Sequence, residues 1–208
     1  MSKGIIIPEK MIERVAGTAV PLPEDDQDTD KILPQVFLKK TSFKDMGKYA
    51  YFSDRYDSEG KPIQSHPLND PKYEGARILI AGANYGCGSS REHAPQGLLR
   101  WGISGIIAES YADIFAGNCA SIGIVGVTVP AEKVAELADL VAANPSTQFE
   151  MDLQAKVMRF GENVLQFEMQ EGRRQAFLRG TWDMIPVLMQ YMDEIKAAEA
   201  RIPYLHFK

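Results

Sequence analysis

Apolar residues in the middle of the chain follow two distinct patterns. Three continuous apolar runs, each bounded by polar or turn-forming residues, predict buried strands at residues 76–82, 103–110 and 123–130. A helical pattern follows each run, at residues 95–102, 111–120 and 131–145. In the last of these, apolar residues recur at i, i+3, i+4 and i+7 from Val134, and Asn144-Pro145 ends the pattern. This alternation predicts an α/β core with a central, at least partly parallel sheet and flanking helices.

The flanking regions add further elements to this core. Residues 11–20 predict a strand that leads into a loop rich in proline and acidic residues, and residues 156–169 predict an added β hairpin around Gly161. The C-terminal tail, residues 172–208, is predicted to be helical, with breaks near Gly180 and Pro186. We expect a single domain over residues 1–208.

The long segment 41–71 is rich in Gly, Pro, Ser, Asp and Lys, and aromatic residues are interspersed through it. Loops of this length are usually functional or mobile, and the aromatic residues argue against simple disorder. We expect this loop to be mobile when no partner is bound.

Composition excludes several function classes. The 208 residues are 45% hydrophobic and 25% charged, which is ordinary for a globular protein, and the net charge of −5 disfavours DNA or RNA as a partner. No apolar run is long enough to span a membrane, and the N-terminus does not resemble a signal peptide. The two cysteines and three histidines form no ligand pattern, so we expect no metal or cofactor to be bound by this chain and a cytoplasmic location.

The stretch "ANYGCGSSREHAP", residues 83–95, lies between a predicted strand and a predicted helix. Open α/β sheets bind ligands at such turns, where free backbone N–H groups favour an anion. Ser89 and Glu92 match a capping box, so the turn can also be purely structural. Ser90 is not needed as a cap, and the Arg91 guanidinium suits a carboxylate. The spacing excludes a P-loop and a nucleophile elbow, and Pro95 predicts a separation between this turn and the following helix.

Together with "DTDKILP" before it and "GIIAESYADIFAGN" after it, this stretch resembles the small subunits of isopropylmalate dehydratases in the aconitase superfamily. "KYEGARILIAG" and a Gly-Arg-Arg stretch at residues 172–174 extend the resemblance along nearly the whole chain. The resemblance implies a swivelling β/β/α domain, the counterpart of the fourth domain of aconitase. In this family the domain closes over a cluster that a separate large subunit carries.

The resemblance also implies a reaction. The enzyme would be a hydro-lyase of leucine biosynthesis that interconverts 2-isopropylmalate and 3-isopropylmalate by dehydration and rehydration. It would be active only with the large subunit, on which a four-iron four-sulfur cluster is expected, and its substrate would be a small dicarboxylate. Related enzymes acting on methylmalate and citraconate, on dimethylmalate or on homoaconitate stay open as alternatives. From other classes, a non-catalytic module that binds an anion or nucleotide stays open, whereas a serine hydrolase is disfavoured because no group orients His93 toward Ser89.

Roles for individual residues follow from the same resemblance. Ser89 would be the catalytic base and must act as an alkoxide, which backbone N–H donors and guanidinium groups would stabilise. Substrate binding would involve Ser90, Arg91, Asp30, Phe37, Leu38 and Lys39. Support of these residues would come from Gly86, Gly88, Glu92 and His93.

Simpler roles stay open for some of these positions. Phe37 and Leu38 suit an apolar substrate group, but they are equally compatible with ordinary core packing. Asp28 and Asp30 are also typical of turns and caps. Cys87 is expected to be a small residue in a tight turn.

Overall fold

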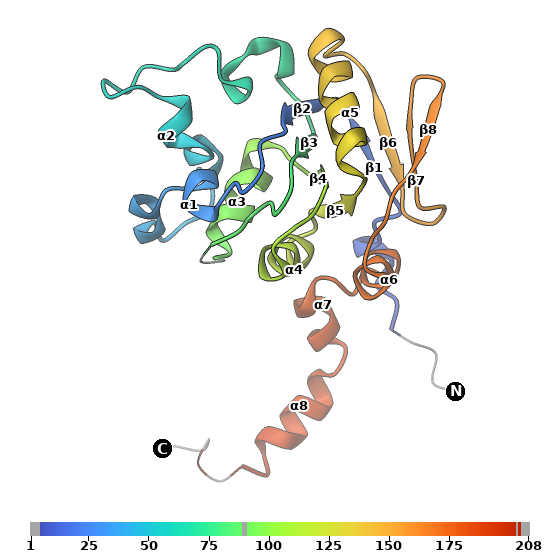
Figure 1. Cartoon of the computed structure of the whole chain (residues 1–208). Coiled ribbons are helices and arrows are strands. Elements are labelled where there is room, and N and C mark those ends of the chain that lie inside the picture. The colour runs from blue at the N-terminus through green and yellow to red at the C-terminus, as the bar shows by residue number, and fades with distance from the viewer. Residues whose placement is uncertain (1–4, 89–90, 203, 205–208) are drawn as a thin grey trace.

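The computed structural model describes residues 5–88, 91–202 and 204 (Figure 1). Its strands are β1 (Arg14–Gly17), β2 (Ala19–Leu22), β3 (Ile78–Ala81), β4 (Gly105–Ala108), β5 (Val125–Thr128), β6 (Phe149–Asp152), β7 (Val157–Phe160) and β8 (Asn163–Gln166). The helices are α1 (Thr29–Ile32), α2 (Phe52–Arg55), α3 (His93–Trp101), α4 (Asp113–Ser121), α5 (Ala131–Ala143), α6 (Glu171–Arg179), α7 (Met184–Met189) and α8 (Met192–Glu199). Short 3-10 helices are η1 (Pro8–Lys10), η2 (Gln35–Lys39), η3 (Met46–Tyr49), η4 (Pro67–Asn69) and η5 (Pro71–Tyr73).

A parallel sheet of order β2-β3-β4-β5 forms the centre of the domain. Each residue of β3 and β4 is buried, which explains their continuous apolar sequences. The three strands predicted here are confirmed, and α3 and α4 connect them as predicted. Pro21 lies in β2, an edge strand of this sheet, where a missing N–H is tolerated.

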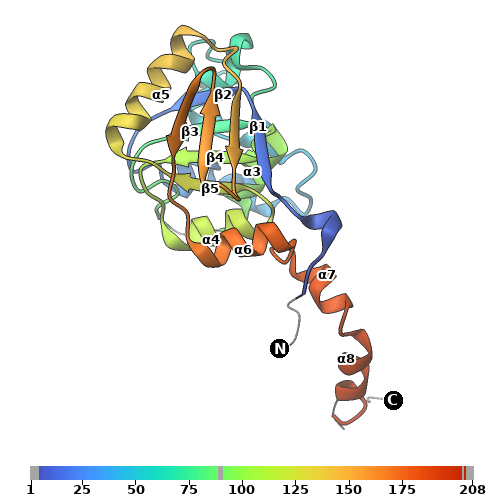
Figure 2. The ribbon, with the colours of Figure 1, turned by 90° about the vertical axis from the view of Figure 1, so that its right-hand side faces the viewer.

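An antiparallel sheet of order β1-β6-β7-β8 packs against the parallel one. The predicted hairpin is confirmed as β7 and β8, with Gly161 at positive φ in its turn. Strand β6, which pairs with both β1 and β7, was not predicted. At the sheet interface, Gly105 of β4 lies so close to Met151 of β6 that a side chain at this position would overlap it. Helices α1 and α3 lie on the far side of the parallel sheet, so the layers are β/β/α, as expected (Figures 1 and 2).

The structure corrects three predicted boundaries. Residues 11–20 form two strands in different sheets, divided at Thr18, whose carbonyl accepts hydrogen bonds from Arg77 and Ile78 amides. Helix α3 begins at His93 and includes Pro95 in its first turn, where a proline needs no amide hydrogen. Pro186 likewise lies in the first turn of α7, so the tail breaks at Gly180 and again at Gln190–Tyr191 instead.

The segment 41–71 is folded around short helical turns. Met46, Ala50 and Tyr51 belong to the hydrophobic core, and η3 packs against α3. The mobility of this segment stays a prediction. It now concerns the exposed part of the segment, such as residues 57–62, because the buried residues are held in the core. Within the described ranges, no helix is long and apolar enough to cross a bilayer.

Candidate active site

Two loops lie side by side at the carboxyl ends of β2 and β3. One is the D-T-D loop, residues 23–30, and the other is the described part of the glycine–serine turn, residues 82–88. Three backbone hydrogen bonds join them: Asp26 N to Ala83 O at 2.9 Å, Gly86 N to Gln27 O at 2.8 Å, and Thr29 N to Cys87 O at 2.9 Å. Side chains add further bonds, from Asn84 Nδ2 to Asp26 Oδ1, from Ala83 N to Asp25 Oδ1 and from Cys87 Sγ to Asp26 O. Two motifs far apart in the sequence therefore form one continuous surface.

The glycines of the turn have the backbone conformations expected of them. Gly86 has a φ of 78° and Gly88 a φ of 88°, a region that other residues adopt only with strain. A Cβ at Gly86 would overlap the ring of Phe115, whereas one at Gly88 would have no neighbour closer than 3.5 Å among the described residues. Gly86 is thus required for packing as well as for its φ, and Gly88 for its φ alone.

Asp30 and Arg91 meet although they are 61 positions apart. Arg91 Nη1 lies 3.3 Å from Asp30 Oδ1, and Gln35 Nε2 donates to Asp30 Oδ2 at 2.6 Å. Asp28 caps α1 by accepting from Lys31 N at 2.7 Å, which is the simpler of its two expected roles. Both side chains of the Asp30–Arg91 pair are about a third or more exposed, so this pair contributes at most about 1 kcal/mol to stability. Its value lies in holding the guanidinium in one orientation.

The two serines of the motif, Ser89 and Ser90, lie outside the described residues, and their roles stay predictions. Glu92 occupies the N-cap position of α3 and accepts a hydrogen bond from Gln96 Nε2 at 3.0 Å. His93 makes an edge-on contact with Phe43, with ring centroids 5.1 Å apart.

Comparisons with known proteins decide the family. The Aconitase C-terminal domain family matches residues 9–132. The "3-isopropylmalate dehydratase small subunit" of Synechocystis is 37% identical over 95% of this chain and 96% of its own. The small subunit of the same name from a Thermus thermophilus strain is 41% identical over 91% of this chain and 94% of its own. The chain belongs to the family of 3-isopropylmalate dehydratase small subunits.

A solved structure supports the fold of this small-subunit chain independently. The crystal structure of 3-isopropylmalate dehydratase from Methanocaldococcus jannaschii matches with a TM-score of 0.62 at 23% identity, covering 90% of this chain and 98% of that one. At this identity the likeness concerns the fold alone, and it supports the expected swivel-domain architecture.

In this small-subunit chain the predicted substrate-contacting residues 37–39 belong to η2, the same 3-10 helix as Gln35. Gln35 therefore ties η2 to the Asp30–Arg91 pair. Phe37 stacks on Tyr49 with centroids 4.1 Å apart, and it contacts Phe52 edge-on at 4.9 Å. Leu38 is half-buried against the core and Lys39 is exposed. Packing within the chain thus accounts for much of the apolar character of Phe37 and Leu38. Their contact with substrate stays a prediction.

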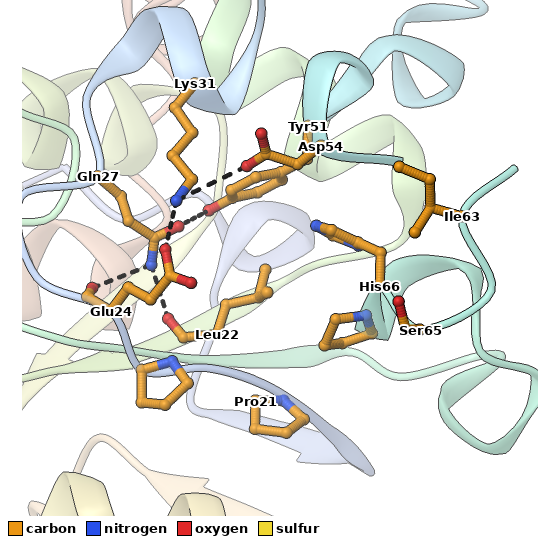
Figure 3. Close-up of a pocket in the computed structure, with 12 residues that line it drawn as sticks. Pro21, Leu22, Glu24, Gln27, Lys31, Tyr51, Asp54, Ile63, Ser65 and His66 are labelled. Atoms are coloured by element: carbon orange, nitrogen blue, oxygen red, sulfur yellow. Dashed lines mark hydrogen bonds and ion pairs between the residues drawn. The ribbon is translucent and has the colours of Figure 1, made fainter. Parts of the chain in front are cut away.

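A buried polar network lies behind the paired loops and was not predicted. The Tyr51 hydroxyl donates to Gln27 Oε1 at 2.7 Å, and Gln27 Nε2 donates to the Leu22 carbonyl at 2.6 Å (Figure 3). The Tyr51 hydroxyl also lies 2.9 Å from the Tyr85 hydroxyl. Burial raises the pKa of both tyrosines, so they stay neutral hydrogen-bonding groups. The network connects segment 41–71 to the residues that precede Asp28 and Gly86.

An open pocket of about 340 Å³ lies beside this network, on the side of α1 that carries Lys31 (Figure 3). Lys31 is paired with Glu24 and, at 3.6 Å, with Asp54, and the hydrogen bond to Glu24 is the main reason that its pKa is raised. Burial lowers the pKa of His66, which also lines the pocket and accepts a hydrogen bond from Leu68 N.

The described residues contain no group of three or more His, Cys, Asp or Glu side chains that could hold a metal ion. Cys87 is half-buried in the turn, where burial raises the pKa of its thiol, and Cys119 is buried in α4. These two thiols do not fit the ligand set of an iron–sulfur cluster.

Proposed function

We propose that this chain is the small subunit of a heteromeric hydro-lyase that interconverts 2-isopropylmalate and 3-isopropylmalate in leucine biosynthesis. One observation supports this beyond the relatives' names: the paired loops bring Asp30 to Arg91, which is two positions after Ser89 in the sequence. This contact supports a site at the edge of the parallel sheet where the two loops meet. We place the enzyme in the cytoplasm.

In the proposed reaction, Ser89 as an alkoxide removes the proton from the carbon next to a substrate carboxylate. The electron pair of that C–H bond forms the alkene as the hydroxyl group leaves the neighbouring carbon as hydroxide. Hydroxide then adds to the carbon that lost the proton, and Ser89 gives its proton to the carbon that lost the hydroxyl group, which restores the alkoxide. Ser90 and Arg91 bind the carboxylate, with Asp30 and Gln35 fixing the guanidinium.

The partner in this proposal is a large subunit that carries a four-iron four-sulfur cluster. The described residues of this chain do not offer a ligand set for it, so the large subunit would hold the cluster, which would supply a Lewis acid for the leaving hydroxyl group. We propose that η2, through residues Phe37, Leu38 and Lys39, lies near the variable side chain of the substrate. Relatives acting on methylmalate, dimethylmalate or homoaconitate differ in this side chain, and turnover of a panel of these dicarboxylates separates them.

The test is an assay of the co-purified complex with a Ser89→Ala variant. We expect assembly to be unchanged and turnover to fall about 10²- to 10⁴-fold, because a general base is lost. Ser58→Ala, in an exposed turn far along the sequence, serves as the control and should leave turnover unchanged. Near-normal turnover by Ser89→Ala removes this serine from its role. Full activity of the small subunit alone, or thermal stabilisation by nucleotides and not by malate derivatives, contradicts the proposed function itself.

A further inference from the structure

The last two helices, α7 and α8, leave the body of the molecule and extend away from both sheets (Figures 1 and 2). We call residues 184–199 the arm. Neither helix of the arm contains a buried residue. Large apolar side chains are nevertheless concentrated here: Met184, Ile185, Leu188, Met189, Tyr191 and Ile195 are between 40% and 72% exposed.

Exposed apolar residues are ordinarily scattered singly over a monomer, whereas these six lie close together in the sequence, between Met184 and Ile195. Charged residues of the arm, among them Asp193, Glu194 and Lys196, are exposed beside them in the sequence. An exposed apolar patch with polar neighbours marks an interaction surface.

The base of the arm is anchored, so the arm has a defined direction. Trp182 Nε1 donates to the Lys10 carbonyl at 2.6 Å, and Lys10 Nζ pairs with Asp183 at 3.0 Å. Asp183 also caps α7 by accepting from the Ile185 amide at 3.1 Å. A helix that is already oriented loses less conformational entropy when it binds, which favours the use of this arm as a docking element.

Helix α6, which precedes the arm in the chain, also connects to the candidate active site. Arg173 of α6 donates to the Asp113 carbonyl at the start of α4, with a distance of 3.3 Å. Phe115 of the same α4 packs on Gly86 and meets the Tyr85 ring edge-on, with centroids 5.3 Å apart. Helices α6 and α4 thus link the region before the arm to the glycine–serine turn, in part through the buried Phe115.

From this arrangement we infer that the arm is a docking element for the large subunit, a step that rests on the proposed function. Area favours this occupant over a second copy of the chain. The arm, residues 184–199, is shorter than the about 20–30 residues, with about 800 Å² of area, that each partner contributes to a standard stable interface. A large subunit that covers the glycine–serine turn can extend over α4 and α6 to the arm and so exceed this area, whereas two arms pairing with each other cannot.

The test uses the full-length chain and the large subunit encoded in the same genome. An Ile185→Asp/Leu188→Asp variant places two charges in the apolar surface of α7. A Gln190→Asp/Ala197→Asp variant adds the same charge at exposed positions of the arm without removing a large apolar side chain. Dissociation constants are measured by surface-immobilised titration, and the mass of each small subunit alone by sedimentation. Thermal melting of the isolated chains checks folding, which exposed substitutions should leave intact.

We expect the α7 variant to raise the dissociation constant at least about 30-fold, and the control variant less than about 3-fold. Equal binding by the α7 variant and the wild type overturns the inference while leaving the proposed function intact. A wild-type homodimer that the α7 variant abolishes, with the heteromer unaffected, assigns the arm to a second copy instead. Failure of the wild-type chain to bind the large subunit at all overturns both the inference and the proposed function.

Discussion

Substituting alanine at Gly86 separates the two constraints that the glycine–serine turn places on its backbone. Gly86 and Gly88 both have positive φ, near 80–90°, but among the described residues a Cβ would overlap a side chain only at Gly86, where it meets the ring of Phe115. A left-handed conformation costs alanine about 1–2 kcal/mol. Forcing a methyl group into a packed site costs about 1–3 kcal/mol more. We therefore expect Gly86→Ala to lower the free energy of unfolding by about 2–5 kcal/mol, and Gly88→Ala by about 1–2 kcal/mol.

Urea denaturation of the isolated chains measures these free energies, provided that the slopes of the transitions agree. A third variant isolates the steric part: Phe115→Leu in the Gly86→Ala background reduces the ring that the new methyl group meets. The double-mutant cycle should show a favourable coupling of about 1–3 kcal/mol. Equal costs at Gly86 and Gly88, or no coupling with Phe115, would refute the packing argument and leave only the φ constraint.

The same variants test whether the turn must be held in place for catalysis. Gly86 N donates to Gln27 O at 2.8 Å, so a shift that relieves the clash also moves the turn relative to the D-T-D loop. A displacement of about 1 Å can reduce turnover by about 10²-fold, and turnover of the assembled enzyme should accordingly fall further for Gly86→Ala than for Gly88→Ala.

Two further predictions concern ionisable groups. Asp30→Asn should lower kcat about 10- to 100-fold without raising KM, because the orientation of Arg91 is lost while a negative charge leaves the site. The control is Asp45→Asn, which breaks an exposed pair with Lys48. A rise in KM at constant kcat contradicts the prediction. Burial lowers the pKa of His66 in the folded chain, so the unfolded chain binds more protons as the pH falls below about 6.5, and the free energy of unfolding should decrease there. His66→Asn, which keeps an acceptor for the Leu68 amide, should reduce this dependence in urea titrations at pH 5 to 8; an unchanged slope excludes His66 as its source.

The central sheet could be predicted because its physics is local. Strands β3 and β4 are buried on both faces, and this requires the continuous apolar runs that the sequence displays. Strand β6 escaped prediction because its four residues include two acids, Glu150 and Asp152. Ion pairs with Arg14 and Arg159 of the neighbouring strands stabilise these two carboxylates in the sheet. The division at Thr18 likewise depends on partners in β3 and β6, which lie far away in the sequence.

The candidate site shows the same division between local and distant causes. The glycine conformations at residues 86 and 88 follow from the motif itself, and the resemblance identified Asp30 and Arg91. The Tyr51–Tyr85–Gln27 network has no local signal, since Tyr51 lies 34 residues from Tyr85 and 24 from Gln27. The positions of Tyr85 and Gln27, each just before a motif residue, were the available clue. Only the folded chain shows that segment 41–71 supplies the third member.

Charge balance at the Asp30–Arg91 pair bears on the proposed sharing of the site between two subunits. A guanidinium has five N–H donors, and the contact with Asp30 engages one nitrogen, Nη1, so Arg91 can bind a substrate carboxylate while Asp30 holds it. Asp30 offsets the positive charge of Arg91, however, and the proposed substrate carries two carboxylates. The local charge of this pair cannot neutralise both of them, and an alkoxide at Ser89 would add a further negative charge. Positive charge from outside the pair is therefore required. Lys39 of η2 is one source in the proposed site, and the surface facing the proposed large subunit is another.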